Sequence, residues 1–246
     1  MLHDPSHITQ IPMEQEIVLT SAEKTILRRL GARIAEIAAL STHREKARLW
    51  QKMNDLKQER PMVWINEIPW HEMNVNDELT LQTTNPWARE LEINLRQTIY
   101  QWNHMRCDMI VNDYLDSPIV YHTTDFGIVE DVDTVHVDEK NAIYSRHFKI
   151  QIKEPVDIEK IKNPKITYKE KATHFSFEAM QDLFSGIIPV KKVGQTHIWY
   201  TPWDFLIRWW GIEEAMMDLC LRPEWCMPPT RKWWTRGWTN LTSLKP

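Results

Sequence analysis

Acidic, imidazole and aromatic side chains follow three short apolar runs of this sequence. Carboxylates and imidazoles transfer protons near neutral pH, and aromatic rings form the walls of sites for flat apolar ligands. The predicted catalytic set is Glu67, His71 and Asp113. The predicted substrate-binding set around them consists of Asn66, Trp70, Tyr114, Asp116, His197 and Trp199.

The three apolar runs predict buried strands of a parallel sheet in an α/β fold. Residues 62–65, 109–112 and 188–191 are short, largely apolar runs, and a helical pattern follows each of them. Right-handed crossovers place such strands side by side, and parallel α/β proteins bind ligands at the carboxyl ends of their strands. The polar residues after the runs should therefore share one cleft. Acidic residues at strand ends also cap the helices that follow, so a structural role stays open for Glu67 and for Asp113.

Helical patterns and one hairpin surround these runs. Apolar residues recur at helical spacing over residues 21–57 and again after Asn85, where Pro86 suits the first turn of a helix. Further helices are predicted at 169–184, 203–210 and 212–221. Alternating runs at 126–133 and 144–152 predict an antiparallel hairpin outside the parallel sheet.

The segment from Trp225 to Pro246 differs from the rest of the chain. It is basic, holds four of the 13 Trp residues and shows neither a helical nor a strand period. A back-translation of this tail, read one base out of frame, gives an amphipathic helical pattern, which indicates a frameshift. A genuine Trp-rich tail that docks on the domain or on a partner is the alternative. The sequence thus predicts a helical extension at 1–57, an α/β domain at 58–224 and an irregular, poorly packed tail at 225–246.

Composition argues against several classes of function. The 30 basic and 34 acidic residues are well mixed and leave a net charge of -4, so no strong field attracts nucleic acid. No apolar run reaches the roughly 18 residues of a membrane span, and no secretory signal begins the chain, which predicts a cytoplasmic protein. Cys107 and Cys220 lie among apolar residues and are expected to be buried thiols. The sequence has no Cys-x-x-Cys spacing that would indicate a structural zinc site.

Three segments resemble the uroporphyrinogen decarboxylase (URO-D) superfamily. They are RLWQKMNDLKQERPMVWINEIPWHEM, DMIVNDYLDSP and WYTPWDFLIRWWGIEEAMMDLCLRPE, within residues 48–224. The resemblance is closest to the decarboxylase-like proteins of anaerobic bacteria that are grouped with corrinoid-dependent methyltransferases. It implies the N-terminal part of a (β/α)8 TIM barrel with about three βα units. It also places Asp113 at the position of the family's essential Asp.

The methyltransferase branch implies a cobalamin that a partner corrinoid protein carries. It also raises zinc as a metal of the full-length parent, for which no ligand is named in this chain. In true uroporphyrinogen decarboxylases, arginines in the loop after the first strand bind substrate carboxylates, whereas residues 66–71 contain no Arg. The leading expectation is therefore methyl transfer from a small methylated substrate. Uroporphyrinogen decarboxylation and an inactive truncated fragment are the alternatives.

Overall fold

The computed structural model describes residues 17–135, 145–195 and 201–232. The chain divides into two compact units, one comprising residues 1–120 and 170–196 and the other residues 121–169 and 197–246. Both units combine helices with short strands, so the prediction of a mixed α/β protein is confirmed at this level. The strands of the described residues form three separate two-stranded sheets and no closed barrel.

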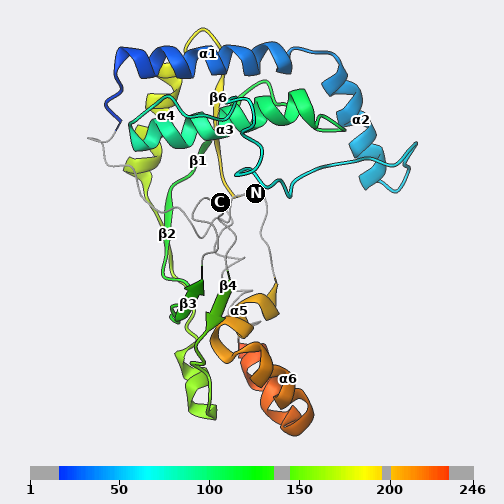
Figure 1. Ribbon diagram of the computed structural model, residues 1–246, viewed down its shortest axis with the longest axis vertical. Coiled ribbons are helices and arrows are strands. Elements are labelled where there is room, and N and C mark those ends of the chain that lie inside the picture. Colours follow the sequence, from blue (N-terminus) through cyan, green and yellow to red (C-terminus); the bar gives the residue numbers. More distant parts are fainter. Residues whose placement is uncertain (1–16, 136–144, 196–200, 233–246) are drawn as a thin grey trace. The chain divides into compact units, whose positions relative to one another are not determined.

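Helices α1 (Ser21–Ala38) and α3 (Pro86–His104) pack side by side in the first unit (Figure 1). Thr20 caps α1 within a capping box, and Asn85 caps α3 ahead of a proline in the first turn. These caps explain why both helices begin where the sequence predicts them. Their apolar sides meet in a shared core that contains Leu27, Leu30, Ile34, Ile37, Leu95 and Trp102.

Helix α2 (Thr42–Asn54) brings two polar side chains into the interior of this unit, His43 and Lys46. The Nζ atom of Lys46 donates to the carbonyl oxygen of Cys107 at 2.7 Å, and burial lowers the pKa of Lys46. Nδ1 of His43 accepts a hydrogen bond of 3.3 Å from the backbone N–H of Val111. Both side chains thus tie α2 to the segment that follows α3.

A parallel strand pair, β1 (Leu115–Pro118) and β6 (Val190–Val193), completes the first unit. Helix α4 (Glu170–Phe184) leads into β6 and contacts both strands. The third predicted strand, 188–191, is thus present in part as β6, which begins two residues later, and its parallel neighbour β1 lies after the second predicted run and not within it.

The apolar run at 109–112 is not itself a strand, which corrects the prediction. Met109 and Val111 are buried in the core with the helices, so packing against helices accounts for the apolar character of this run. As a consequence, Asp113 and Tyr114 precede β1 instead of following a strand end, and Asp116 lies inside the strand.

The first predicted strand, residues 62–65, is wrong as well, because no strand is assigned there. Val63 and Trp64 are 49% and 50% exposed, so this run is not buried on both faces. Val63 instead bonds to Asp108: its N–H donates to Oδ2 at 2.9 Å, and its carbonyl accepts from the backbone N–H at 3.1 Å. The segment is an irregular connection held beside Asp108.

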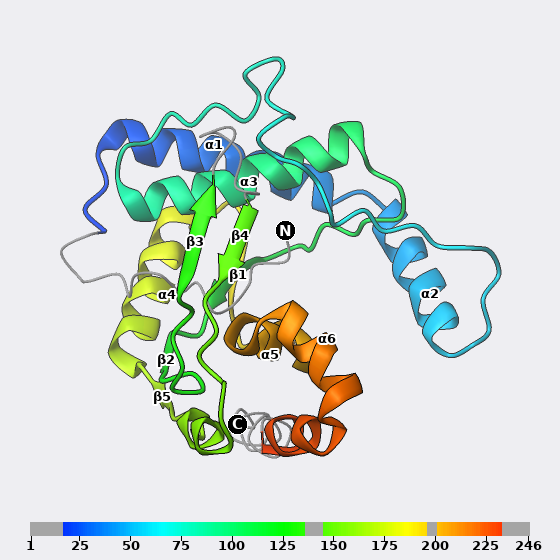
Figure 2. The same ribbon diagram turned by 60° about the horizontal axis from the view of Figure 1, so that its bottom comes forward.

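The second unit contains two antiparallel strand pairs. Strand β3 (Val132–Val135) pairs with β4 (Ser145–Phe148), side by side in Figure 2, and β2 (Tyr121–Thr123) pairs with β5 (Ile166–Tyr168). The predicted hairpin outside the parallel sheet is confirmed, although its strands are shorter than the alternating runs.

Helices α5 (Pro202–Trp210) and α6 (Ile212–Leu221) and the 3-10 helix η3 (Pro155–Lys160) contribute to one core, and α5 also contacts β4. Gly211 separates α5 from α6 with a φ of 89°, a value that a glycine adopts without strain. The core of this unit contains Phe126, Ile128, Ile152, Ile158, Ile161, Leu206, Trp209, Trp210 and Ala215.

The beginning of the tail belongs to this core. Residues 223–232 are helical, and Trp225 and Cys226 are buried, which contradicts the predicted irregular packing for this part of the tail. The ring of Trp225 lies edge-on to that of Trp210, with centroids 6.2 Å apart. One large side chain therefore anchors a segment that has no apolar period. Residues 233–246 lie outside the described residues.

Helix α6 leaves much of its apolar surface in solvent. Its exposed apolar side chains are Ile212, Met216, Met217, Leu219 and Leu221. The expectation of buried thiols at Cys107 and Cys220 is also wrong, because the first lies in an exposed turn with a φ of 35° and the second on this outer side of α6. Within the described part of the chain, no helix combines the length and the apolar character needed to cross a membrane.

Candidate functional site

The structure separates the predicted site residues into two groups. Trp70 and His71 lie in turns that follow the irregular segment beside Asp108, while Tyr114 directly precedes β1 and Asp116 lies within it. No hydrogen bond, ion pair or ring contact joins any two of Glu67, His71 and Asp113, all three of which are described residues, so their convergence on one cleft stays a prediction. Three further residues after the third run lie outside the described residues: His197, Trp199 and Tyr200.

The second group forms a cluster with a residue from the neighbouring strand. Asp116 of β1 and Lys191 of β6 are register partners, so their side chains leave the strand pair on the same face. The Nζ atom of Lys191 lies 3.6 Å from the centroid of the Tyr114 ring, a cation–π contact. Tyr114, Asp116 and Lys191 are called the Lys191 cluster below. It places an acid, an ammonium group and a phenol ring together.

The face that carries this cluster points away from α4. Ser117 and Lys192, the next pair in register, point to the opposite face, where Ser117 is fully buried and Lys192 lies 4.7 Å from the ring centroid of Phe177 in α4. Because side chains alternate along a strand, Asp116 and Lys191 must point away from that helix. Both residues are exposed and available to a ligand.

The environment of Asp116 raises the pKa of its carboxyl. Burial of the carboxyl raises the pKa of Asp116, and the positive charge of Lys191 opposes part of that rise. The residue as a whole is exposed, so the neighbouring protein withdraws water from the carboxyl without enclosing it. A carboxyl whose pKa is raised is a better proton donor near neutral pH than an ordinary aspartate.

The first group contains an imidazole oriented by a carboxylate. Nε2 of His104 lies 2.9 Å and 3.1 Å from the two carboxylate oxygens of Glu78. Its ring centroid is 4.3 Å from that of Tyr100, which in turn meets Trp70 edge-on at 6.1 Å. His71 beside them lies 3.5 Å from a carboxylate oxygen of Glu72. Of the predicted residues, only Trp70 and His71 belong here.

Sequence reasoning missed Glu78, Tyr100 and His104 for a clear reason. Glu78 and His104 are 26 positions apart, with most of α3 between them, so no local spacing signals their pairing. Lys191 lies at the end of the apolar run 188–191, but only the register of β6 against β1 places it beside Asp116.

Arg60 and Asp108 form an ion pair that joins two of the segments that resemble the URO-D superfamily. Arg60 donates from Nη2 to Oδ1 of Asp108 at 2.5 Å and from Nη1 to Oδ2 at 3.0 Å. This guanidinium, which outweighs the effect of burial, lowers the pKa of Asp108 to about 2. With the bonds from Val63, the arrangement fixes the segment at 60–63 next to residue 108.

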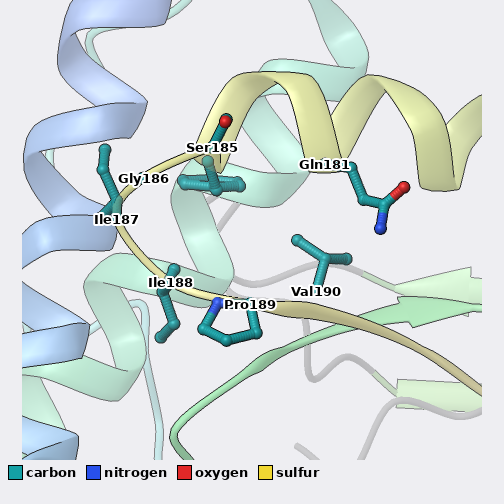
Figure 3. Close-up of a pocket in the computed structure, with 8 residues that line it drawn as sticks. Gln181, Ser185, Gly186, Ile187, Ile188, Pro189 and Val190 are labelled. Carbon is teal, nitrogen blue, oxygen red and sulfur yellow. The ribbon is translucent and has the colours of Figure 1, made fainter.

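Two open pockets lie elsewhere in the first unit. One, of about 350 Å³, lies at the turn from α4 into β6, where Figure 3 shows the chain passing through Ser185, Gly186 and Ile187 to Pro189. The other, of about 670 Å³, is lined by residues around Arg60, from Met53 to Met62. Neither pocket is lined by a predicted site residue.

Neither a metal cluster nor a known relative identifies the site. Among the described residues, no three His, Cys, Asp or Glu side chains are grouped so that they could hold a metal ion, so the zinc implied by the resemblance finds no ligand set there. No family model matches the chain, and no curated protein or solved structure matches it.

Proposed function

We propose that this protein is a URO-D-like methyltransferase, which transfers a methyl group from a small substrate to the corrinoid of a partner protein. The resemblance of three segments within residues 48–224 supports this reaction class. The finer fold is part of the same proposal: the N-terminal part of a (β/α)8 barrel with an inserted hairpin. We place the reaction in the cytoplasm, a reducing compartment that suits the free thiols of Cys107, Cys220 and Cys226.

The observation that carries the proposal is the contact between Arg60 and Asp108. The resemblance assigns their segments to the first and second strands of a barrel, which are neighbours in that fold, although neither 62–65 nor 109–112 is a strand in the structure. In the structure, the two segments lie together through the Arg60 guanidinium and the bonds of Val63 to Asp108. The parallel pairing of β1 with β6, and α4 leading into β6, also agree with consecutive βα units.

The Lys191 cluster supplies the chemistry that such a reaction needs from the protein. A methyl group that leaves an oxygen, sulfur or nitrogen atom as a cation equivalent leaves an electron pair on that atom. A nearby proton donor stabilises the leaving group, and the raised pKa of Asp116 suits it to donate this proton. The methyl group itself goes to the partner's corrinoid.

Two features weigh against porphyrinogen decarboxylation. The segment from Asn66 to His71 contains no Arg, and a substrate with many carboxylates needs several cations. The Lys191 cluster offers a single ammonium group, which is enough for a small substrate only.

Anaerobic incubation of the purified chain with cob(I)alamin tests the proposal. Methyl ethers, thioethers and amines are supplied in turn, and the absorbance change that accompanies methylation of the cobalt is followed. We expect methylation above the rate without protein for at least one class. Asp116→Asn should slow it by about 10²-fold or more, the usual contribution of a general acid. Glu170→Gln, an exposed acid at the start of α4, is the matched control and should leave the rate unchanged.

Three outcomes separate the alternatives. Methylation that does not respond to Asp116→Asn removes the assigned proton donor. Turnover of uroporphyrinogen without methyl transfer favours the decarboxylase. A folded protein that turns over neither substrate contradicts the proposal and supports the inactive fragment.

A further inference from the structure

Lys191 carries a positive charge that the protein positions without neutralising it. Its Nζ atom lies 3.6 Å from the centroid of the Tyr114 ring, and no ion pair joins it to a carboxylate within the described part of the chain. Lys149 in the second unit shows the contrast, because two carboxylates, of Asp131 and Asp133, surround it. The N–H groups of Lys191 are therefore free to bind an anionic ligand.

Asp116 does not serve as the missing counter-ion. The two residues are register partners, yet their charged groups are not within ion-pair distance of each other. Burial raises the pKa of the Asp116 carboxyl, and the positive charge of Lys191 opposes part of that rise.

The same face continues into an apolar surface. Pro118 and Val193 are register partners two positions beyond Asp116 and Lys191, so they lie on this face about 7 Å further along the strands. Pro118 is exposed and Val193 is half-buried. A ligand that contacts both parts needs an anionic group at one end and an apolar body a few ångströms long.

We propose that the Lys191 cluster binds a small carboxylate, with the anionic group on Lys191 and the apolar body over Pro118 and Val193. The inference deepens the proposed function, because it assigns an anionic group to the methylated substrate. The binding site itself does not depend on methyl transfer.

Titration calorimetry with benzoate and benzamide tests the site without any turnover. The two compounds have nearly the same shape, but only benzoate carries a charge. We expect benzoate to bind at least tenfold more tightly than benzamide, and we expect added salt to weaken benzoate alone. This comparison uses the unaltered protein, so it does not depend on the folding of a variant.

Variants at neighbouring lysines locate the site. Lys191→Met should weaken benzoate binding at least tenfold, and Lys191→Arg should retain it. Lys192→Met is the matched control, because Lys192 is the next residue of β6 but lies over Phe177 on the opposite face, and it should bind benzoate as the unaltered protein does.

Equal binding of benzoate and benzamide, or equal losses in Lys191→Met and Lys192→Met, would overturn the inference. Selective benzoate binding that is lost in Lys191→Met, in a protein that shows no methyl transfer, would uphold this site and reject the proposed reaction. Methyl transfer from neutral substrates alone would reject the anionic substrate and leave the reaction standing.

Discussion

Glu92 and Arg96 form a buried ion pair in the first unit. The side chain of Glu92 is 0% exposed and that of Arg96 is 9% exposed. One turn apart on α3, they are 2.7 Å apart between Nε and Oε1. The carboxylate also accepts hydrogen bonds from the backbone N–H groups of Gln82 and Thr83 and from the Thr83 hydroxyl. Burial raises the pKa of Glu92, but these bonds from Thr83, Arg96 and Gln82 outweigh it and lower the pKa overall. The pair thus holds the chain ahead of α3 in place.

Replacing Glu92 by Gln should lower the free energy of unfolding by about 3 kcal/mol, because the substitution leaves the Arg96 guanidinium buried without a counter-charge. Urea denaturation of the two proteins measures the difference. Glu90→Gln is the control, since Glu90 lies on the same helix in an exposed position. Similar losses in the two variants would show that the buried pair contributes nothing specific.

Acid should weaken the contact between α1 and the start of α3. Backbone N–H groups of Asn85, Thr20 and Thr84 bond to the carboxylate of Glu23 and lower its pKa from 4.5 to about 2. A lowered pKa in the folded state adds stability above pH 4.5, and this stability is lost as the pH falls from 4.5 towards 2. We expect the urea midpoint of the unaltered protein to fall over this interval more steeply than that of Glu23→Gln. Parallel pH profiles would contradict the assignment.

Local signals in the sequence predicted the helices well. Asn85-Pro86 marks the start of α3 through a hydrogen bond to a residue three positions away, so the sequence contains the whole motif. The sequence pattern placed the cap of the first helix at Ser21, whereas the structure has it one residue earlier, at Thr20. The alternating runs on either side of the hairpin are equally local, and the hairpin is present. These elements depend on neighbours along the chain.

The strands and the candidate site depend on distant residues and were predicted less well. Met109 and Val111 resemble a buried strand because they are apolar, but they pack with the helices, and Val63 bonds to Asp108 45 positions away. Tyr114 and Asp116 were named from the sequence, whereas their partner Lys191 enters only through strand register. The pairing of Glu78 with His104 likewise requires the fold of the intervening chain. Composition alone cannot distinguish an apolar run buried in a sheet from one buried against helices.

Gly31 is required by a close approach between α1 and the end of α4. A Cβ atom at this position would lie 2.6 Å from Cε1 of Phe184, whose side chain is fully buried. Gly31→Ala should therefore destabilise the protein by about 1–3 kcal/mol, because the ring has little space into which to move. Urea denaturation measures the loss.

Gly186→Ala is a useful comparison for this substitution. Gly186 has a φ of 75° and no atom within 4 Å of an added Cβ, so the cost there is backbone strain alone, about 1 kcal/mol. Adding Phe184→Leu to Gly31→Ala should recover part of the loss if the clash is its cause. A double variant that is simply less stable by the sum of both effects would reject the steric explanation.

The outer face of α6 should promote self-association of the isolated protein. Met216 and Met217 are 62% and 57% exposed, and Ile212, Leu219 and Leu221 of the same helix are exposed as well. Exposed apolar side chains associate in water because each contact removes apolar area from solvent. Replacing Met216 and Met217 together by Gln should lower the average mass in sedimentation at high protein concentration. It should leave the urea midpoint nearly unchanged, since neither side chain is in the core.

Glu213→Gln, on the same helix, tests whether any substitution there lowers the average mass. A protein that is monomeric at every concentration, or a double variant that associates as strongly as the unaltered chain, would show that the apolar face of α6 does not drive association.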